Sequence, residues 1–240
     1  MKKNILITGG SSGIGAEIVR TLAKEDYVSG LGIQYNQSKE GALRLQKKFG
    51  TYVEIEQLKA DFNSSSVDLV ERFLEKFHYI DVLINCAGVV SSVSFDELTV
   101  QEYDRVMHVN SRYAYLITKD AFNSMKERGG KIINISGAAT SFGMGRNHSI
   151  QYAASKATLD ILTIGLARMG AKYNILVNSV SPGLIMTRLH ENRIDKKARA
   201  NLVPLKRFGT PGDIADMVEF LVSDKGNFIT GQVFRISGGE

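Results

Sequence analysis

The fold of this chain is decided by the stretch Ile5-Leu6-Ile7-Thr8-Gly9-Gly10-Ser11-Ser12-Gly13-Ile14-Gly15. Residues 4–8 have the apolar run of a buried strand, and the apolar residues of 16–23 recur at helical spacing. Between them lies a turn with few side chains, and glycine lacks the Cβ that would block a close approach. Backbone N–H groups and the positive end of the helix can therefore reach a phosphate. The stretch predicts the phosphate-binding turn of a dinucleotide site.

The spacing of these glycines is T-G-x-x-x-G-x-G, which differs from the widely quoted fingerprint G-x-G-x-x-G. A tight connection between strand and helix, with no ligand, is the other interpretation that this motif allows by itself. The rest of the chain has to decide between the two.

Composition and length indicate one domain, residues 1–240. Hydrophobic residues make up 43% and charged residues 23% of the 240 residues, as in ordinary soluble proteins. The apolar stretches are much shorter than a membrane span, and no apolar leader of secretory length precedes the first strand. The single cysteine, Cys86, cannot form an intramolecular disulfide. We expect a cytoplasmic protein with no membrane partner.

The formal net charge of +5 does not indicate a nucleic-acid partner. Lys and Arg are scattered among acidic residues, and the densest basic cluster, 196–199, fits a solvated helix face better than a nucleic-acid patch. A mildly positive field favours anionic ligands, such as a dinucleotide or an acidic carrier.

Strand-like apolar segments alternate with amphipathic segments throughout the chain. This alternation is typical of a parallel sheet with helices on both faces. It predicts an α/β protein, a single-domain Rossmann fold whose doubly wound parallel sheet has about seven strands. A polar segment near 184–211, around a possible short helix, is the predicted substrate loop. The predicted strands are 4–8, 31–35, 52–58, 81–86, 131–136, 175–181 and 232–236.

The segments that directly follow the predicted strands are rich in Gly, Ser, Asn, Asp and Thr. Ligands of such sheets bind outside the carboxyl ends of the strands, near the reversal of strand order. Any one of these segments is explained as a plain turn, but six together predict a binding edge. They are 8–15, 35–38, 61–62, 85–88, 136–140 and 182–187.

Tyr152 and Lys156 lie four residues apart in a segment predicted to be helical from 152 to 167. Both therefore project from one helix face, with Cβ atoms about 5–6 Å apart. Free tyrosine has a pKa of about 10, but a nearby ammonium stabilises the phenolate and lowers that pKa. Such a tyrosine suits proton transfer at a carbonyl oxygen during hydride transfer. Without the context of the rest of the chain, an exposed polar pair on a helix is the favoured interpretation of this motif.

Taken together, these residues resemble the short-chain dehydrogenase/reductase family over essentially the whole chain. The glycine stretch matches the cofactor loop of the family, 85–88 matches its Asn-Asn-Ala-Gly motif with one change, and 182–187 matches the segment that embraces the nicotinamide amide. Asp61 matches an adenine contact, and Asn110 matches a catalytic asparagine. Within the family, the chain is most similar to bacterial 3-oxoacyl-acyl-carrier-protein reductases and related sugar dehydrogenases.

The resemblance implies a role for each matched residue. Tyr152 would donate the proton, Lys156 would lower its pKa and hold the nicotinamide ribose, and Asn110 would anchor a water that relays protons. No residue is expected to bind a metal. The predicted cofactor-binding residues are Gly9, Ser11, Ser12, Gly13, Ile14, Gly15, Asn36, Ser38, Asp61, Phe62, Asn85, Ala87, Gly88, Tyr152, Lys156, Pro182, Gly183, Ile185 and Thr187.

One position departs from the family pattern. The family places a catalytic serine second in a Ser-Ser pair after the fifth strand, whereas this chain reads Ser136-Gly137. The loop that follows, up to Gln151, is also about two residues longer than the resemblance implies. Ser136, Thr140 and Ser141 are the candidates to orient the substrate carbonyl, and we place Ser136 first because it lies at the end of a strand.

The residues after the second predicted strand favour NADP(H) over NAD(H). An acidic residue at this place would bind the ribose 2′-hydroxyl and repel a 2′-phosphate, yet 36–39 contain no acid, and the first is Glu40. Asn36 and Ser38 can donate hydrogen bonds to the phosphate, and Lys39 can add charge. Ser12 occupies a position where many NADP-dependent members of the family carry Arg or Lys, and its lack of charge is an argument against NADP(H).

The sequence thus predicts an NADP(H)-dependent carbonyl reductase, with 3-oxoacyl thioesters as the first substrate class, which implies a place in fatty acid biosynthesis. Alternatives are a sugar or polyol dehydrogenase, a cofactor-binding protein with little turnover, and, more distantly, a nucleic-acid-binding module. The substrate would be a small molecule or carrier-bound. The family resemblance implies a homotetramer, consistent with apolar residues on more than one face of the Tyr152 helix: Leu159, Ile161, Leu162, Ile164 and Leu166.

Overall fold

The computed structural model describes residues 2–63, 68–91, 93–138, 150–187 and 196–240. Their core is one parallel sheet of seven strands in the order β3-β2-β1-β4-β5-β6-β7. All seven predicted strands are confirmed, with ends displaced by a few residues. They are β1 (Lys3–Thr8), β2 (Val28–Tyr35), β3 (Glu54–Lys59), β4 (Val82–Asn85), β5 (Gly130–Ile135), β6 (Ile175–Pro182) and β7 (Val233–Ile236).

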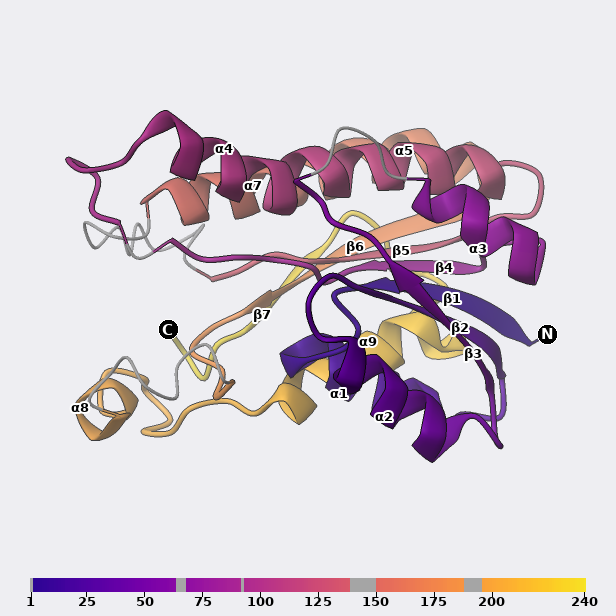
Figure 1. Ribbon diagram of the computed structural model, residues 1–240, viewed down its shortest axis with the longest axis horizontal. Coiled ribbons are helices and arrows are strands. Elements are labelled where there is room, and N and C mark those ends of the chain that lie inside the picture. Colours follow the sequence, from indigo (N-terminus) through magenta and orange to yellow (C-terminus); the bar gives the residue numbers. More distant parts are fainter. Residues whose placement is uncertain (1, 64–67, 92, 139–149, 188–195) are drawn as a thin grey trace.

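Helices cover both faces of the sheet, as Figure 1 shows. One layer contains α1 (Gly13–Leu22), α2 (Lys39–Phe49) and α9 (Pro211–Val222). The other contains α3 (Leu69–Phe77), α4 (Val100–Met107), α5 (Tyr113–Met125) and α7 (Ile150–Gly170). The short helix α8 (Lys196–Ala200) stands apart, beside the carboxyl edge of the sheet. Single turns are η1 (His108–Arg112), η2 (Ala171–Tyr173) and η3 (Asp224–Gly226).

β1 shows why the strands read as continuous apolar runs. Ile5 and Ile7 pack in the core beneath the layer of α1, α2 and α9, whereas Leu6 packs beneath the layer of α3 and α5. All three side chains are fully buried. Successive side chains of a strand point to opposite faces, so a strand covered on both faces needs an apolar residue at every position.

The strand order reverses between β1 and β4, which the chain visits first and fourth. Thr8 at the end of β1 is level with Asn85 at the end of β4, and Asn85 is level with Asn134 on β5. The segments that leave these strands therefore meet at one edge of the sheet, which is where a doubly wound sheet binds its ligand. Within the part of the chain that the structure describes, no helix is both long and apolar enough to cross a membrane.

Candidate active site

The glycine stretch forms a tight turn from β1 into α1. Gly9 has φ +65°, and a Cβ there would lie 2.8 Å from the Cα of Ala87. A Cβ on Gly15 would collide with the carbonyl oxygen of Gly9, so α1 can start only where it does if this residue is glycine. Gly13 has φ +53°, and a Cβ there would meet only the Thr187 methyl group, 3.8 Å away. The turn is therefore closed on its inner side and open toward 182–187.

The amino-terminal end of α1 is free to bind an anion. Ser12 precedes the helix in an extended conformation, and its side chain makes no capping hydrogen bond. Ser12 and Gly13 are exposed, Ile14 is partly buried, and Ser11 is buried. The first N–H groups of a helix have no partner within it, and here they lie at the open side of a glycine turn. This arrangement fits the pyrophosphate of a dinucleotide.

Two further polar side chains hold the turn in place, of which the sequence placed Thr8 in the motif and gave Gln34 no role. Gln34 on β2 is buried; its Oε1 accepts from the Gly9 N–H at 2.8 Å, and its Nε2 donates to the Ala60 carbonyl at 2.8 Å. Thr8 Oγ1 accepts from the N–H groups of Cys86 and Ala87, at 3.0 and 3.1 Å. The available signal was a glutamine inside an otherwise apolar strand.

The residues predicted to bind the adenosine half follow β2 and β3. Asn36 is exposed, and Ser38 precedes α2 without making a side-chain cap. Asp61 is exposed, with its carboxylate accepting from the Asn63 N–H at 2.9 Å. The Phe62 ring is buried and stacks on Tyr113, with ring centroids 5.5 Å apart. The side chain of Phe62 thus belongs to the core, which leaves only its backbone for the predicted cofactor contact.

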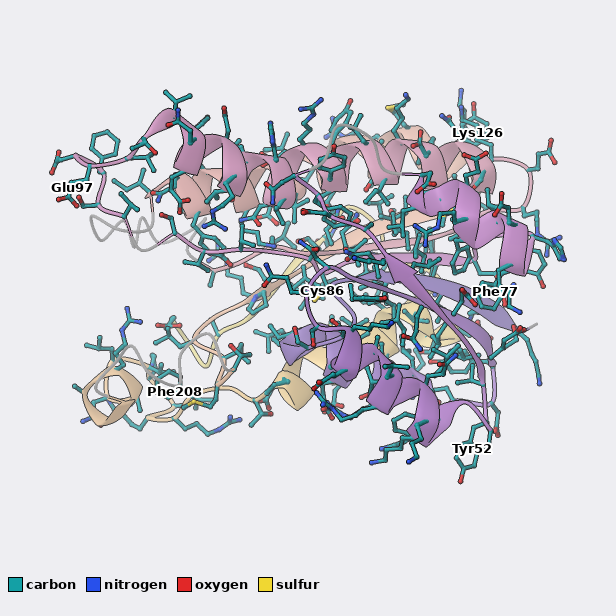
Figure 2. The ribbon with its side chains drawn as sticks, in the orientation of Figure 1. Tyr52, Phe77, Cys86, Glu97, Lys126 and Phe208 are labelled. Atoms are coloured by element: carbon teal, nitrogen blue, oxygen red, sulfur yellow. The ribbon has the colours of Figure 1, made fainter. Side chains whose placement is uncertain are left out.

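Asn85 ties the end of β4 to the layer of α5 and α7. Its buried Nδ2 donates to Thr118 Oγ1 on α5 at 2.7 Å and to Asn134 Oδ1 on β5 at 2.8 Å. Cys86 follows directly, and Figure 2 shows it between the two helix layers, in the middle of the molecule. Burial raises the pKa of the Cys86 thiol to about 11, so that the group is neutral at physiological pH.

Asn110 lies in η1, a π-helical turn that joins α4 to α5. Such turns recur at functional sites because the extra residue turns side chains out of the helical repeat. The fully buried Asn110 side chain accepts from the Val89 N–H at 2.8 Å and donates to the Val89 carbonyl at 2.9 Å. It also donates to Ser155 Oγ, at 2.9 Å, and Ser155 in turn donates to the Tyr152 carbonyl. Asn110 therefore links the segment after β4 to the helix that carries Tyr152.

Tyr152 and Lys156 both lie in the first turns of α7, as predicted. Lys156 is buried; its Nζ donates to the Ile135 carbonyl at 2.9 Å and would lie 3.1 Å from a Cβ on Gly88. A Cβ on Gly137 would lie 3.6 Å from the Tyr152 hydroxyl oxygen, which is its nearest atom among the described residues. The position where the family keeps a serine thus faces the Tyr152 hydroxyl, and a serine side chain would fit there.

The electrostatics of this pair differ from the simple expectation. Burial raises the pKa of Tyr152 to about 12, instead of the lowering that the sequence led us to expect. Burial also lowers the pKa of Lys156 to about 8, against the opposing effects of Cys86 and Asp160. Burial is the larger cause of both shifts, because removing a charge from water destabilises the charged form; for Tyr152, the nearby Cys86 raises the pKa further. Tyr152 is therefore a neutral proton donor.

Ser136 is buried at the end of β5, and its hydroxyl faces the interior. Its Oγ lies 3.0 Å from Ser179 Oγ, which lies 2.9 Å from an oxygen of Asp160. Because Ser179 has one hydroxyl proton and a carboxylate is the stronger acceptor, Ser136 is left to donate to Ser179. The alternatives Thr140 and Ser141 lie outside the described residues.

The segment that follows β6 closes the other side of the edge. The Gly183 N–H donates to the Ile236 carbonyl at 2.9 Å, and the Met186 N–H donates to the Gly209 carbonyl at 2.8 Å. Ile185 between them is buried, and Pro182 and Thr187 are partly buried. The Thr187 methyl group faces Gly13 across the opening of the glycine turn. The structure thus brings the glycine turn and the segment 182–187 together at this edge of the sheet.

Comparisons with known proteins agree with this geometry. The family model described as enoyl-(acyl carrier protein) reductase matches residues 9–240. The chain is 32% identical to the 3-oxoacyl-[acyl-carrier-protein] reductase FabG of Staphylococcus aureus strain Mu50, over 100% of this chain and 98% of the relative. It is 30% identical to the acetoacetyl-CoA reductase of Allochromatium vinosum, over 100% and 98%.

The chain belongs to the short-chain dehydrogenase/reductase family. Solved structures of the family include a short-chain dehydrogenase of Burkholderia cenocepacia in complex with NADP, with TM-score 0.92 and 31% identity over 99% of this chain and 97% of that chain. A blue fluorescent protein from a metagenomic library, in complex with NADPH, has TM-score 0.92 and 32% identity over 99% and 98%. As a short-chain dehydrogenase/reductase, the protein is an NAD(P)-dependent oxidoreductase.

Proposed function

We propose that the protein is an NADP(H)-dependent reductase of 3-oxoacyl thioesters. The observation that carries the proposal is the convergence of Lys156 and Asn110 beside Gly88, one residue after the Ala87 that packs on the glycine turn, with Tyr152 one turn before Lys156 on α7. Relatives named as 3-oxoacyl-acyl-carrier-protein and acetoacetyl-CoA reductases, matched over nearly their full length, support this substrate class. Such a reductase would act in fatty acid biosynthesis, in the cytoplasm.

The residues of the site suit the reduction of a carbonyl. A bound nicotinamide cofactor supplies the hydride that reaches the carbonyl carbon. The neutral Tyr152 hydroxyl then donates its proton to the carbonyl oxygen, and the Lys156 ammonium stabilises the phenolate left behind. Asn110 holds α7 and the segment after β4 in register. We also propose that Asn110 anchors a water that relays protons, as the family resemblance implies. Gly9, Gly13 and Gly15, with Gln34 behind them, would hold the pyrophosphate of the cofactor.

The preference for NADP(H) over NAD(H) rests on the charges after β2. The first acidic residue is Glu40, whose carboxylate oxygen lies 3.5 Å from the Arg44 guanidinium on the next turn of α2, and both side chains are exposed. No carboxylate precedes the helix at the place where it would repel a 2′-phosphate. Asn36, Ser38 and the uncapped N–H groups of α2 remain to donate hydrogen bonds to that phosphate.

Gly137 favours one second candidate, a dehydrogenase of a hydroxylated substrate such as a polyol or a sugar. Among the described residues, nothing lies closer than 3.6 Å to a Cβ on Gly137, where the family has a serine. A hydroxyl beside the reacting carbon can occupy this space in front of the Tyr152 hydroxyl. Acetoin dehydrogenase YohF of Salmonella typhimurium is similar in structure, with TM-score 0.89 and 27% identity. If the protein catalyses neither reaction, the missing serine favours a third candidate, a cofactor-binding protein with little turnover.

We further propose that the chain assembles as a homotetramer through α5 and α7. Ile161 and Ile164 are exposed on α7, next to a groove of about 620 Å³ between the two helices. Exposed apolar surface of this kind marks association sites. Light scattering at micromolar concentration should give four times the chain mass. A monomer would contradict the proposal.

The decisive experiment measures NADPH and NADH oxidation by the purified protein with acetoacetyl-CoA, a 3-oxoacyl-acyl-carrier protein and a panel of hydroxyketones and sugars. Turnover of the thioesters with NADPH supports the proposal, and turnover of hydroxyketones or sugars alone supports the second candidate. Cofactor binding measured by fluorescence, with no turnover of any substrate, would mean a cofactor-binding protein.

A further inference from the structure

Residues 237–240 lie between two parts of the segment that joins β6 to α9. We refer to these four residues as the tail. Figure 1 shows this end of the chain at the carboxyl edge of the sheet, on the side where α8 lies. On one side the tail contacts Gly183 and Leu184, and on the other it contacts residues 203–205. The tail thus contacts both arms of the substrate loop, although it follows them in sequence.

The first contact is centred on Glu240. The Leu184 N–H donates to Glu240 Oε2 at 3.2 Å, and the Ser237 hydroxyl donates to the Glu240 carbonyl at 3.2 Å. A Cβ on Gly183 would lie 2.7 Å from both Glu240 Oε2 and Ser237 Cα. The glycine of the Pro182-Gly183 pair is therefore required by the close approach of the tail. No side chain fits between this arm and the tail.

The second contact is made by the two glycines of the tail. Gly238 has φ +66°, and its carbonyl accepts from the Leu205 N–H at 3.1 Å. A Cβ on Gly238 would lie 2.8 Å from Val203 Cγ1, and a Cβ on Gly239, with φ +96°, would lie 3.0 Å from Pro204. Val203 itself is buried. The backbone of the tail therefore packs directly on this arm.

These contacts leave one backbone donor of the first arm available. The N–H groups of Gly183, Leu184 and Met186 donate to Ile236, Glu240 and Gly209, respectively. Within residues 183–186, the Ile185 N–H alone has no acceptor among the described residues. A rigid arm with one free donor is suited to receive the carboxamide of a nicotinamide.

We propose that Glu240 is a positioning residue, whose carboxylate holds the arm at 183–186 in the conformation that binds the cofactor. This inference rests on the proposed cofactor site but not on the proposed substrate. A hydrogen bond to a charged acceptor, of ordinary net strength, corresponds to about a tenfold change in population. Losing it should weaken cofactor binding by the same factor, because only the competent fraction binds.

The test compares Glu240→Ala with Glu240→Gln in the full chain. Glu240→Ala should raise the dissociation constant for NADPH by about tenfold and leave kcat at saturating cofactor within about twofold. Glu240→Gln keeps an oxygen acceptor for the Leu184 N–H and should stay within about threefold of wild type. Glu75→Ala, an exposed glutamate on α3, is the matched control and should change nothing.

A second readout does not depend on cofactor or turnover. Hydrogen–deuterium exchange of peptides covering 183–187 should speed up by about tenfold in Glu240→Ala, and not in Glu75→Ala. Unchanged exchange in Glu240→Ala would overturn the proposal, as would equal losses of NADPH affinity in Glu240→Gln and Glu240→Ala. If the wild type does not bind NADPH at all, the proposed function fails, and the exchange rates still decide the role of Glu240.

Discussion

The buried ammonium of Lys156 should make the stability of the protein depend on pH in a predictable direction. Burial lowers the pKa of Lys156 from 10.5 to about 8. At 1.36 kcal/mol per pKa unit, this shift corresponds to about 3 kcal/mol of lost stability while the group is charged. The unfolded chain binds this proton more tightly than the native state. The free energy of unfolding therefore rises with pH between about 8 and 10.5.

The assay is urea unfolding of the wild type and Lys156→Met at pH 7 and pH 9.5. Integrating the linkage relation between these values gives a gain of about 2 kcal/mol for the wild type relative to the variant. Methionine keeps most of the volume and carries no charge, so other titrations cancel in the difference. The exposed Lys47→Met on α2 is the control, and its stability should run parallel to wild type.

One result would refute the reasoning about Lys156. If the difference between the wild type and Lys156→Met is the same at pH 7 and pH 9.5, the ammonium is not destabilised by burial. The hydrogen bond to the Ile135 carbonyl would then compensate fully for the lost hydration.

Three other predictions concern the chemistry of the site. Tyr152→Phe should lower turnover by at least about a hundredfold with little change in NADPH affinity, because only the proton donor is lost; near-normal steady-state rates would reject this role. If Ser136 orients the substrate carbonyl, Ser136→Ala should raise the activation free energy of turnover by about 2–4 kcal/mol. If the Ser136 hydroxyl instead donates only to Ser179, Ser136→Ala should leave kcat nearly unchanged, and Gly137→Ser should raise kcat. Asn36→Asp should move the ratio of NADPH to NADH dissociation constants toward NADH, and an unchanged ratio would place the 2′-phosphate elsewhere.

The sequence alone determined the features that depend on local pattern. The alternation of strand-like apolar segments with amphipathic segments revealed the seven strands, and Gly9, Gly13 and Gly15 marked the turn into α1. The spacing of Tyr152 and Lys156 placed both on α7. Each of these signals lies within one strand, one turn or one helix, where steric limits and periodicity act directly on neighbouring residues.

Tertiary structure alone decided what the polar groups of the site bind. Ser136 reads as an available hydroxyl, yet Ser179, 43 residues later, lies next to it on β6. The Leu184 N–H donates to Glu240, which lies 56 residues later in the sequence, and the Gly9 N–H donates to Gln34, 25 residues later. The pKa of Tyr152 rises because of burial, which the spacing to Lys156 does not reveal. These partners are set by strand order and register, since the sheet brings distant segments together at one edge.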